Sequence, residues 1–297
     1  MKVVAIVVTF HPEFNALGAL LDILNSQVDT VVVVDNCSGN DFYNWFNKFY
    51  AQKVHGIFLA ENTGVATAQN KGIVWARTEG ADAVVLFDQD SLPEHGMVNC
   101  LAMALKNEQA KGNKVAAVGP KYVDERNVDR PSFSRLIGIR LKKVLYEQEI
   151  VPSDFIISSG SLIPICTLDE VGMMNDEFFI DQIDIEWCLR AKACGYQSYG
   201  VCSTTMQHNL GEEPLKFLGF TLLHHSPLRH YYIFRNAIRL LFKSYIPLGW
   251  KLIFIRTLLL RFFLYSLFVT PRLKYCKMMA KGVWHGLKGR MGKFIPG

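Results

Sequence analysis

The hydrophobic pattern of the first 120 residues alternates between two kinds of segment. Short β-branched and aliphatic runs are typical of buried strands, whereas longer segments with apolar residues every three or four positions are typical of helices. This alternation predicts an α/β fold, with a mainly parallel central sheet and helices on both faces. The predicted strands are Val3–Thr9, Thr30–Val34, Val54–Leu59, Ala83–Phe87 and Val115–Val118, and the predicted helices are Asn15–Asn25, Phe42–Tyr50, Ala66–Glu79 and Met97–Ala110.

The pattern after residue 120 is less regular. The charged stretch Asp124–Glu149 predicts an excursion or a mobile loop over the functional site. Phe155–Pro164 and Val201–Met206 resemble strands, and Asp184–Cys194 resembles a helix that Gly195 closes. Further predicted elements are a short helix and turn at Leu168–Ile180 and two very apolar helices at Leu228–Tyr245 and Trp250–Val269.

The charge is divided unevenly along the 297 residues. Pro214–Gly297 contains fifteen Lys or Arg and no Asp or Glu, which leaves 17 basic and 27 acidic residues in 1–213. We therefore expect two regions, an α/β region at 1–213 and a basic, apolar, helical region at 214–297. Such asymmetry favours an anionic membrane surface as partner of the second region. Internal packing or a homo-oligomer contact is the alternative, and nucleic acid is disfavoured.

Membrane contact of this kind would be peripheral. Arg256 and Arg261 lie within Trp250–Val269, and each would cost ~2.5–3.5 kcal/mol at a bilayer centre. An interfacial helix therefore fits better than a spanning one. The seven cysteines form no C-x-x-C pair and show no zinc-like spacing, which favours reduced thiols and a cytoplasmic protein. The apolar run Val3–Val8 is too short for a signal peptide.

Polar residues follow four of the predicted strands, at Thr9, Asp35, Asn62 and Asp88. The carboxyl ends of parallel strands gather at one edge of a sheet, where open α/β folds bind ligands. Asp88 and Asp90 would face the same side if the strand continued to Asp90, and together they would suit Mg²⁺ or Mn²⁺. The alternative is a polar turn in which Asp90 and Ser91 cap the next helix.

Further motifs follow in chain order: Asn62-Thr63-Gly64, Asn70-Lys71-Gly72, Ser159-Gly160-Ser161, Phe178-Phe179 with Asp184, Glu186 and Arg190, and His208. This order resembles the family 2 inverting glycosyltransferases of the GT-A fold. Within them it is most similar to the bacterial dTDP-rhamnosyltransferases of O-antigen and related polysaccharides. The resemblance covers about residues 3–240. It departs from the family pattern at Ile183, which stands where a Glu is typical.

The resemblance implies that region 1–213 is a nucleotide-sugar-binding and catalytic domain of the GT-A fold. It also implies a catalytic and metal-binding set. Asp184 is the expected general base, with an N-cap of the following helix as the alternative role. Asp90 is the first choice for the metal ligand, Asp88 a second ligand or a ribose contact, and His208 a third ligand. Glu186 is expected to orient its neighbours or to cap the helix, and to pair with Arg190 four residues on.

The resemblance also implies a nucleotide-sugar-binding set. Asp35 would accept a hydrogen bond from N3–H of thymine or uracil, and Thr9 would line the same pocket. Gly64 would permit close backbone approach at a helix N-terminus that favours phosphate. Arg229 and Arg235 are expected to form a basic face toward solvent or lipid, and contact of either one with the diphosphate or a lipid phosphate is the alternative. The full set is Thr9, Asp35, Asn62, Gly64, Asn70, Asp88 and Gln89.

The expected function is transfer of L-rhamnose from dTDP-β-L-rhamnose to a lipid-linked saccharide acceptor at the inner face of the cell membrane. A UDP-hexose or UDP-galactofuranose transferase is the nearest alternative. A non-catalytic, membrane-associated partner of a polysaccharide assembly complex is the alternative from another class. A dinucleotide-dependent oxidoreductase is disfavoured because no G-x-G-x-x-G follows the first strand, which ends in Thr-Phe-His-Pro.

Overall fold

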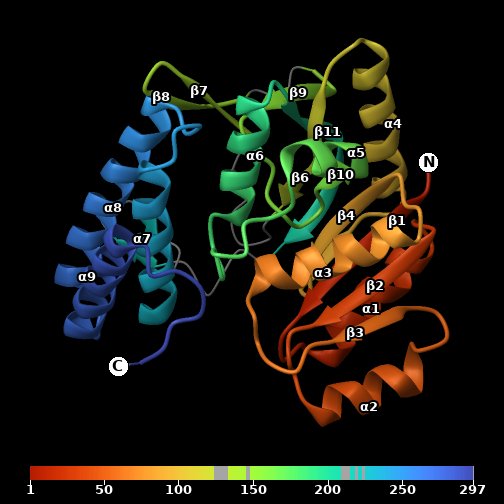
Figure 1. The fold of residues 1–297 in the computed structure, drawn as a ribbon, viewed down its shortest axis with the longest axis horizontal. Coiled ribbons are helices and arrows are strands. Elements are labelled where there is room, and N and C mark those ends of the chain that lie inside the picture. The colour runs from red at the N-terminus through yellow and green to blue at the C-terminus, as the bar shows by residue number, and fades with distance from the viewer. Residues whose placement is uncertain (124–132, 145–147, 209–214, 218–219, 223–224, 297) are drawn as a thin grey trace.

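The computed structural model describes residues 1–296 except 124–132, 145–147, 209–214, 218–219 and 223–224. Its central sheet has the strand order β3-β2-β1-β4-β10-β6-β11-β5, and β9 pairs with β11 (Figure 1). The first four strands in chain order are parallel, as predicted, and their carboxyl ends meet at one edge. These strands are β1 (Val3–Thr9), β2 (Thr30–Asp35), β3 (His55–Phe58) and β4 (Ala83–Asp88).

The other half of the sheet is mixed in direction. β6 (Val115–Val123) and β11 (Gln197–His208) are parallel, whereas β10 (Leu162–Pro164) is antiparallel to β4 and β6. β5 (Ser91–Pro93) and β9 (Ile150–Ser153) run antiparallel to β11. The long strand predicted at Phe155–Pro164 is wrong in length, because a turn at residues 158–161 leaves only the last three residues paired.

Alternate residues of β1 serve two hydrophobic cores, one on each face of the sheet. Val3, Ala5 and Val7 pack with α1 (Phe14–Asn25), α2 (Asn40–Phe49) and α4 (Met97–Ala110). Val4, Ile6 and Val8 share the second core with α3 (Val65–Thr78), α5 (Ile165–Val171) and α6 (Ile183–Ala193). The predicted covering of both faces is therefore confirmed.

Three C-terminal helices lie side by side and join the second core (Figure 1). They are α7 (Pro227–Leu241), α8 (Leu248–Phe268) and α9 (Arg272–Lys288). Glycines let α9 approach α7 closely, because a Cβ on Gly282 would lie 2.5 Å from the Tyr231 carbonyl oxygen. Among the described helices, none is both long enough and apolar enough to cross a bilayer.

The described part of the predicted excursion is a hairpin of β7 (Ser134–Ile137) and β8 (Arg140–Lys143). Asp154 fixes its position, since its carboxylate accepts from the Leu136 amide at 2.8 Å and from Lys192 at 2.5 Å. Lys192 lies at the C-terminal end of α6, whereas Asp184 lies at the N-terminal end. The expectation of a loop over the site is therefore wrong for this hairpin. Another small hairpin, β12 (Leu215–Phe217) and β13 (Phe220–Leu222), precedes α7.

Candidate active site

A tight turn at residues 158–161 joins the end of β4 to the start of α6. The Ser159 hydroxyl accepts from the Asp88 amide at 3.1 Å and shares a 2.6 Å hydrogen bond with Ser91. The Ser158 amide donates to the Asp184 carboxylate. The turn depends on Gly160, whose φ of 77° lies in the left-handed region. Two carboxylates that are far apart in sequence, Asp88 and Asp184, are thereby brought to one place.

Asp184 is a partly buried carboxylate with raised basicity. Burial raises its pKa to about 6, and the negative charges of Asp88 and Asp181 add to the rise. Amide donors from Ile185 and Ser158 oppose the rise without cancelling it. A carboxylate with this pKa is ionised at neutral pH and is a stronger proton acceptor than an ordinary Asp, as a general base requires.

The turn that precedes Asp184 is held in an unfavourable backbone conformation. Asp181 and Gln182 have φ values of 68° and 63°, and non-glycine residues in this region cost of order 1–3 kcal/mol each. Gln182 is the N-cap residue of α6 and makes no side-chain capping bond. The alternative reading of Asp184 as the N-cap is therefore wrong, since Asp184 lies inside the first turn of the helix.

Helix α7 holds this strained turn in place. The Asn236 amide donates to the carbonyl oxygens of Ile180 and Asp181 at 2.8 and 2.9 Å. Arg229 binds the Asp181 carboxylate through Nε and Nη2 at 3.1–3.3 Å. The sequence did not predict these roles of Asn236 and Asp181. The sequence offered one indication for Asn236, which is its position next to Arg235 within the part of the chain that resembles the family.

The two arginines proposed as phosphate contacts have different environments. Arg235 is fully buried and donates to the carbonyl oxygen of Gly292, so both the expected exposed basic face and the alternative phosphate contact are wrong for this residue, and its role is structural. The side chain of Arg229 is 41% exposed. Burial lowers the pKa of Arg229, but the carboxylates of Asp181, Asp88 and Asp90 together raise it above its ordinary value. Arg229 therefore lies within the electrostatic reach of this acidic cluster.

The Asp88-Gln89-Asp90 segment does not continue as a strand. β4 ends at Asp88, and Gln89 and Asp90 form a turn before β5, so the same-face argument for the two aspartates is wrong. The capping alternative is wrong as well, because α4 begins at Met97 after the N-cap Gly96. Gln89 ties two strand ends together, since its amide accepts from the Phe10 nitrogen at 2.7 Å and donates to the Phe10 oxygen at 3.3 Å.

The donor atoms at this edge suit a hard divalent cation. Asp88 is partly buried and Asp90 is exposed, and Mg²⁺ is commonly held by one or two carboxylates with phosphate oxygens and waters completing its shell. His208 pairs in the β11–β5 ladder with Ser91, the neighbour of Asp90, while its side chain lies outside the described part. No three His, Cys, Asp or Glu side chains of the described residues form a metal cluster by themselves.

Thr9 and Asp35 meet at the adjoining ends of β1 and β2. The Thr9 hydroxyl donates to Asp35 at 2.9 Å, and Asp35 also accepts from the amide (2.8 Å) and the hydroxyl of Ser38. Both Thr9 and Asp35 are buried. A carboxylate has about four acceptor positions, so Asp35 can accept one donor more. Its predicted contact with a pyrimidine N3–H remains a prediction.

The start of α3 is shaped by a close approach of Phe179. The Val65 amide donates to the Phe179 carbonyl at 2.7 Å, and a Cβ on Gly64 would lie 2.5 Å from that oxygen. Asn62 accepts from the Gly64 amide at 3.0 Å. Close packing against Phe179 therefore explains why a glycine occupies position 64, independently of the predicted contact with phosphate.

Two further side chains of the predicted sets have structural partners. Asn70 exchanges hydrogen bonds with the backbone of Met174 at 2.8 and 3.0 Å, so these contacts give no support to its predicted role in donor binding. Glu186 is buried and pairs with Arg190 at 2.9 Å, which confirms the predicted pairing four residues apart.

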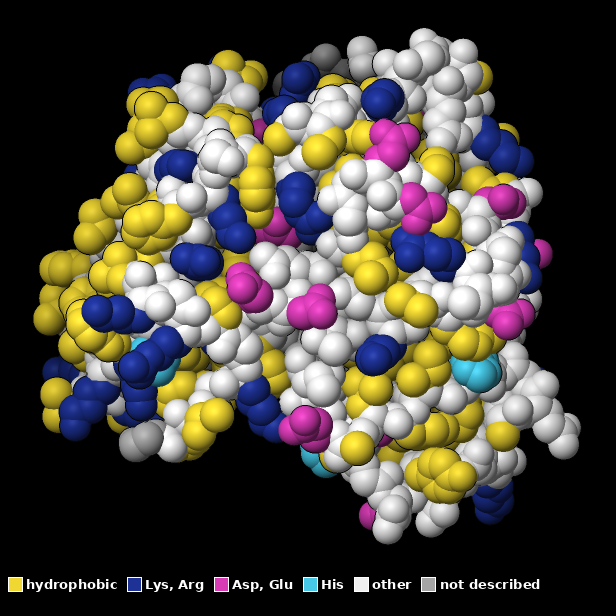
Figure 2. Space-filling model, in the orientation of Figure 1, with side chains coloured by type: hydrophobic (Ala, Val, Ile, Leu, Met, Phe, Trp, Pro, Cys, Tyr) yellow, Lys and Arg dark blue, Asp and Glu magenta, His cyan; other side chains and the backbone are white. Residues whose placement is uncertain are grey.

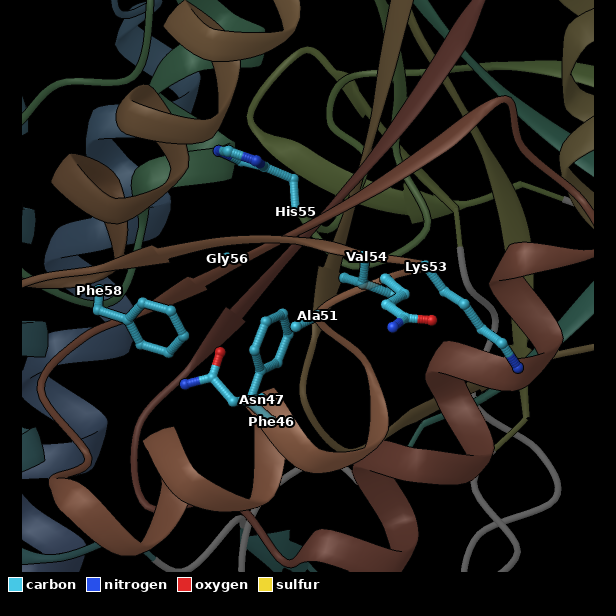
Figure 3. A pocket seen from close by; sticks show the side chains of 9 residues that line it. Phe46, Asn47, Ala51, Lys53, Val54, His55, Gly56 and Phe58 are labelled. Atoms are coloured by element: carbon cyan, nitrogen blue, oxygen red, sulfur yellow. The ribbon is translucent and has the colours of Figure 1, made fainter.

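A shallow hollow lies beside the outermost strand of the sheet. It has a volume of about 410 Å³ and runs along the outer strand β3 and the segment that leads into it (Figure 3). None of the predicted site residues lines it. It is lined by Phe46, Asn47, Ala51, Gln52, Lys53, Val54, His55, Gly56 and Phe58.

Residues 5–158 match the family described as Glycosyl transferase family 2. The chain belongs to this family. It is also 34% identical over 253 residues to the dTDP-rhamnosyl transferase RfbF of Shigella flexneri, an alignment that covers 83% of this chain and 82% of that protein. The predicted glycosyltransferase activity class is therefore confirmed, and this family 2 member is an enzyme.

Solved structures confirm the GT-A fold class. S. aureus TarS 1–349 in complex with UDP-GlcNAc has a TM-score of 0.62 and 17% sequence identity, covering 98% of this chain and 82% of that chain. GalNAc-T7 with UDP, GalNAc and Mn²⁺ has a TM-score of 0.62 and 11% identity, covering 97% of this chain. The chain described here spans only 56% of the length of GalNAc-T7. At these identities the likeness concerns the fold alone.

Proposed function

We propose that this enzyme transfers L-rhamnose from dTDP-β-L-rhamnose to a hydroxyl of a lipid-linked saccharide during synthesis of a cell-surface polysaccharide such as O-antigen. It would act as a peripheral protein on the cytoplasmic face of the cell membrane. The observation that carries the reaction type is the meeting of Asp88 and Asp184 at the turn 158–161. The choice of donor is supported by the dTDP-rhamnosyl transferase that resembles this chain.

Asp184 is the base of the proposed reaction. It takes the proton of the acceptor hydroxyl while that oxygen forms a bond to the anomeric carbon of the donor. The bond from the anomeric carbon to the diphosphate oxygen breaks, and dTDP leaves with its electron pair. A single displacement of this kind inverts the β-linked donor to an α-L-rhamnosyl product. The transition state is expected to resemble an oxocarbenium ion, as in glycoside hydrolysis.

The leaving diphosphate needs positive charge beside it. Asp90 and Asp88 would hold Mg²⁺ or Mn²⁺, with His208 as a third candidate ligand, and the bound ion would neutralise the diphosphate. Arg229 adds a fixed cation from the protein, since its charge is coupled to Asp88 and Asp90. The α3 N-terminus after Gly64 would supply backbone dipoles of the same sign.

The nucleobase of the sugar donor would lie at the ends of β1 and β2. Asp35 would accept from N3–H of thymine, and Thr9 fixes the carboxylate that does so. Uracil presents the same N3–H group, so this contact does not separate dTDP from UDP donors. A UDP-hexose or UDP-galactofuranose transferase therefore remains the second candidate on the same site.

A thermal-shift screen with Mg²⁺ or Mn²⁺ tests the donor, because a ligand that binds the native state raises the unfolding temperature. We expect dTDP-rhamnose to stabilise the enzyme more than UDP-glucose or UDP-galactofuranose at equal concentration. The shift should shrink for Asp90→Ala. Stronger stabilisation by a UDP-sugar would replace the proposed donor with the second candidate.

An assay of sugar transfer tests the role of Asp184 as the general base. We expect Asp184→Ala to abolish transfer while keeping the thermal shift with the donor, whereas Asp41→Ala, an exposed carboxylate on α2, leaves both unchanged. Turnover of Asp184→Ala near the wild-type rate would remove Asp184 from the mechanism. Donor binding without turnover by the wild-type chain, across a panel of lipid-linked saccharides, would favour the non-catalytic alternative.

A further inference from the structure

The outer side of α8 carries a stripe of large apolar side chains. Leu248, Leu252, Ile255, Leu259 and Phe263 are between 41% and 72% exposed. Their spacing of three or four residues places them on one side of the helix. The opposite side packs into the core through residues such as Trp250, Phe254 and Leu258. Stability of the fold therefore does not explain the outer stripe, which lies over α8 among the hydrophobic side chains at the left of Figure 2.

The β7–β8 hairpin extends this stripe at the start of α8. A Cβ on Gly249 would lie 2.6 Å from the Gly138 carbonyl oxygen, so the tip of the hairpin rests on the first turn of the helix. Ile137 and Ile139 at this tip are 55% and 63% exposed. The hairpin and α8 are more than one hundred residues apart in sequence (Figure 1). Their apolar residues nevertheless form one surface, called the α8–hairpin surface below.

The charged residues of the described hairpin and of the C-terminal helices are all basic. Arg135, Arg140 and Lys142 are exposed on the hairpin, and Arg256 is exposed on α8. Residues 133–144 and 214–297 contain no Asp or Glu in the sequence. On α9 the pattern repeats, since Trp284 is 54% exposed and the Lys288 ammonium lies 4.9 Å from its ring centroid. The surface therefore combines exposed apolar side chains with basic ones, and neither the described hairpin nor the C-terminal helices contribute an acidic one.

We infer that the α8–hairpin surface docks on an anionic lipid bilayer, lying in the headgroup region with its apolar side chains at the acyl boundary. Aliphatic and aromatic side chains flanked by Lys and Arg fit this environment, where anionic headgroups supply the opposite charge. A second copy of the chain fits poorly, because a symmetric contact would place the same basic residues against each other. The inference deepens the proposed function and rests on it for the membrane that holds the acceptor.

Docking through this surface would hold the active site close to the membrane. Helix α7 packs against α8 on one side and binds the turn before Asp184 through Arg229 and Asn236. One helix thus separates the docking surface from the catalytic turn. A lipid-linked saccharide anchored in the same bilayer would present its sugar near that turn.

Vesicle sedimentation tests the inference with the full chain. The vesicles contain phosphatidylethanolamine and phosphatidylglycerol at 7:3, or phosphatidylcholine alone. We expect the wild-type chain to bind the anionic vesicles at least tenfold more tightly than the neutral ones, with binding falling as salt rises. The variant Leu252→Gln/Leu259→Gln/Phe263→Gln should lose at least tenfold of the anionic binding. The charge variant Arg140→Glu/Lys142→Glu should lose binding to a similar extent.

A matched control replaces exposed apolar side chains elsewhere, in Phe49→Gln/Val74→Gln/Met103→Gln on α2, α3 and α4. This variant should bind vesicles as the wild type does. Thermal shift with the dTDP donor shows that each variant is folded, and it also separates the two proposals, because donor binding does not require the docking surface. Unchanged vesicle binding of folded stripe and charge variants would overturn the inference. A wild-type dimer that the stripe variant converts to monomer, without vesicle binding by either, would assign the surface to a second copy instead.

Discussion

At the scale of single residues, Asp184 combines two properties that oppose each other. Its carboxylate is partly removed from water and lies near Asp88 and Asp181, which raises the pKa to about 6. The same raised pKa that makes it a better base makes its ionised form unfavourable in the folded state. Activity and stability therefore pull in opposite directions at this position.

We predict that Asp184→Asn stabilises the enzyme above pH 6. The folded-state pKa of about 6 exceeds the ordinary value near 4, so ionisation of Asp184 is harder in the folded chain than in the unfolded chain. The wild type loses this free energy as pH rises through the two values, up to about 3 kcal/mol at pH 8. The difference shrinks as the pH falls toward 4, and it vanishes only well below pH 4, where the carboxyl group is protonated in both states.

Urea unfolding of the wild type and Asp184→Asn at pH 8 and pH 4 measures this difference, with Asp41→Asn as the matched control on an exposed helix. The asparagine variant should have the higher free energy of unfolding at pH 8, and most of this difference should be lost at pH 4. Equal stabilisation at both pH values would mean that packing, and not the carboxylate charge, is responsible.

The same scale shows what the sequence could predict about the site. Thr9, Asp35 and Asp88 were found because parallel strands bring their carboxyl ends to one edge, a rule that needs only the strand assignments. The relation between Asp88 and Asp90 was wrong because it assumed that the strand continued into a turn. The contact of Ser158 with Asp184 depends on tertiary structure that no local pattern encodes.

At the scale of elements, α7 determines the geometry of the segment before α6. Two non-glycine residues with positive φ persist only where the surroundings hold them, and Asn236 donates two partly buried hydrogen bonds to this turn. We predict that Asn236→Ala lowers kcat at least tenfold with little change in the KM for the donor. The substitution would misplace the proposed general base, Asp184, and leave the proposed nucleobase pocket at Asp35 intact. It should also cost of order 1–3 kcal/mol of stability.

Leu228→Ala is the matched control for Asn236→Ala, because Leu228 is exposed on the same helix. Steady-state kinetics of both variants, at varied donor concentration, separate the two effects. An increase in KM without a loss of kcat would mean that α7 supports donor binding and not the base.

The start of α3 provides a second test at this scale. Gly64 and Gly80 both have positive φ, but a Cβ on Gly64 would lie 2.5 Å from the Phe179 oxygen, whereas Gly80 faces open space. We predict that Gly64→Ala destabilises the enzyme by at least 1 kcal/mol more than Gly80→Ala, because only the former combines backbone strain with a clash. Denaturant unfolding of both variants measures the difference, and equal losses would contradict the close approach.

At the scale of the whole molecule, the C-terminal helices share a hydrophobic core with residues 1–213 and supply partners to buried side chains of that region. The sequence alone shows the division of charge at residue 214, and the three helices lie after this position in the chain. The side chains that these helices contact could not be predicted from the sequence, because each contact joins residues that are far apart in the chain. Trp250 donates to Asp154 at 3.0 Å, Tyr245 to Glu186 at 2.5 Å and Arg229 to Asp181.

These contacts predict that residues 1–213 do not fold as an independent unit. Without the helices, Asp154 and Glu186 would each lose a buried partner, and the core shared with α3 and α6 would be open to water. Urea unfolding followed by circular dichroism should show one cooperative transition for the full chain and none for the fragment 1–213. A fragment that unfolds cooperatively and binds the dTDP donor as tightly as the full chain would show instead that the helices are a separate appendage. In that case Asn236 and Arg229 would not be needed to form the turn before Asp184, and the loss of kcat expected for Asn236→Ala should be absent as well.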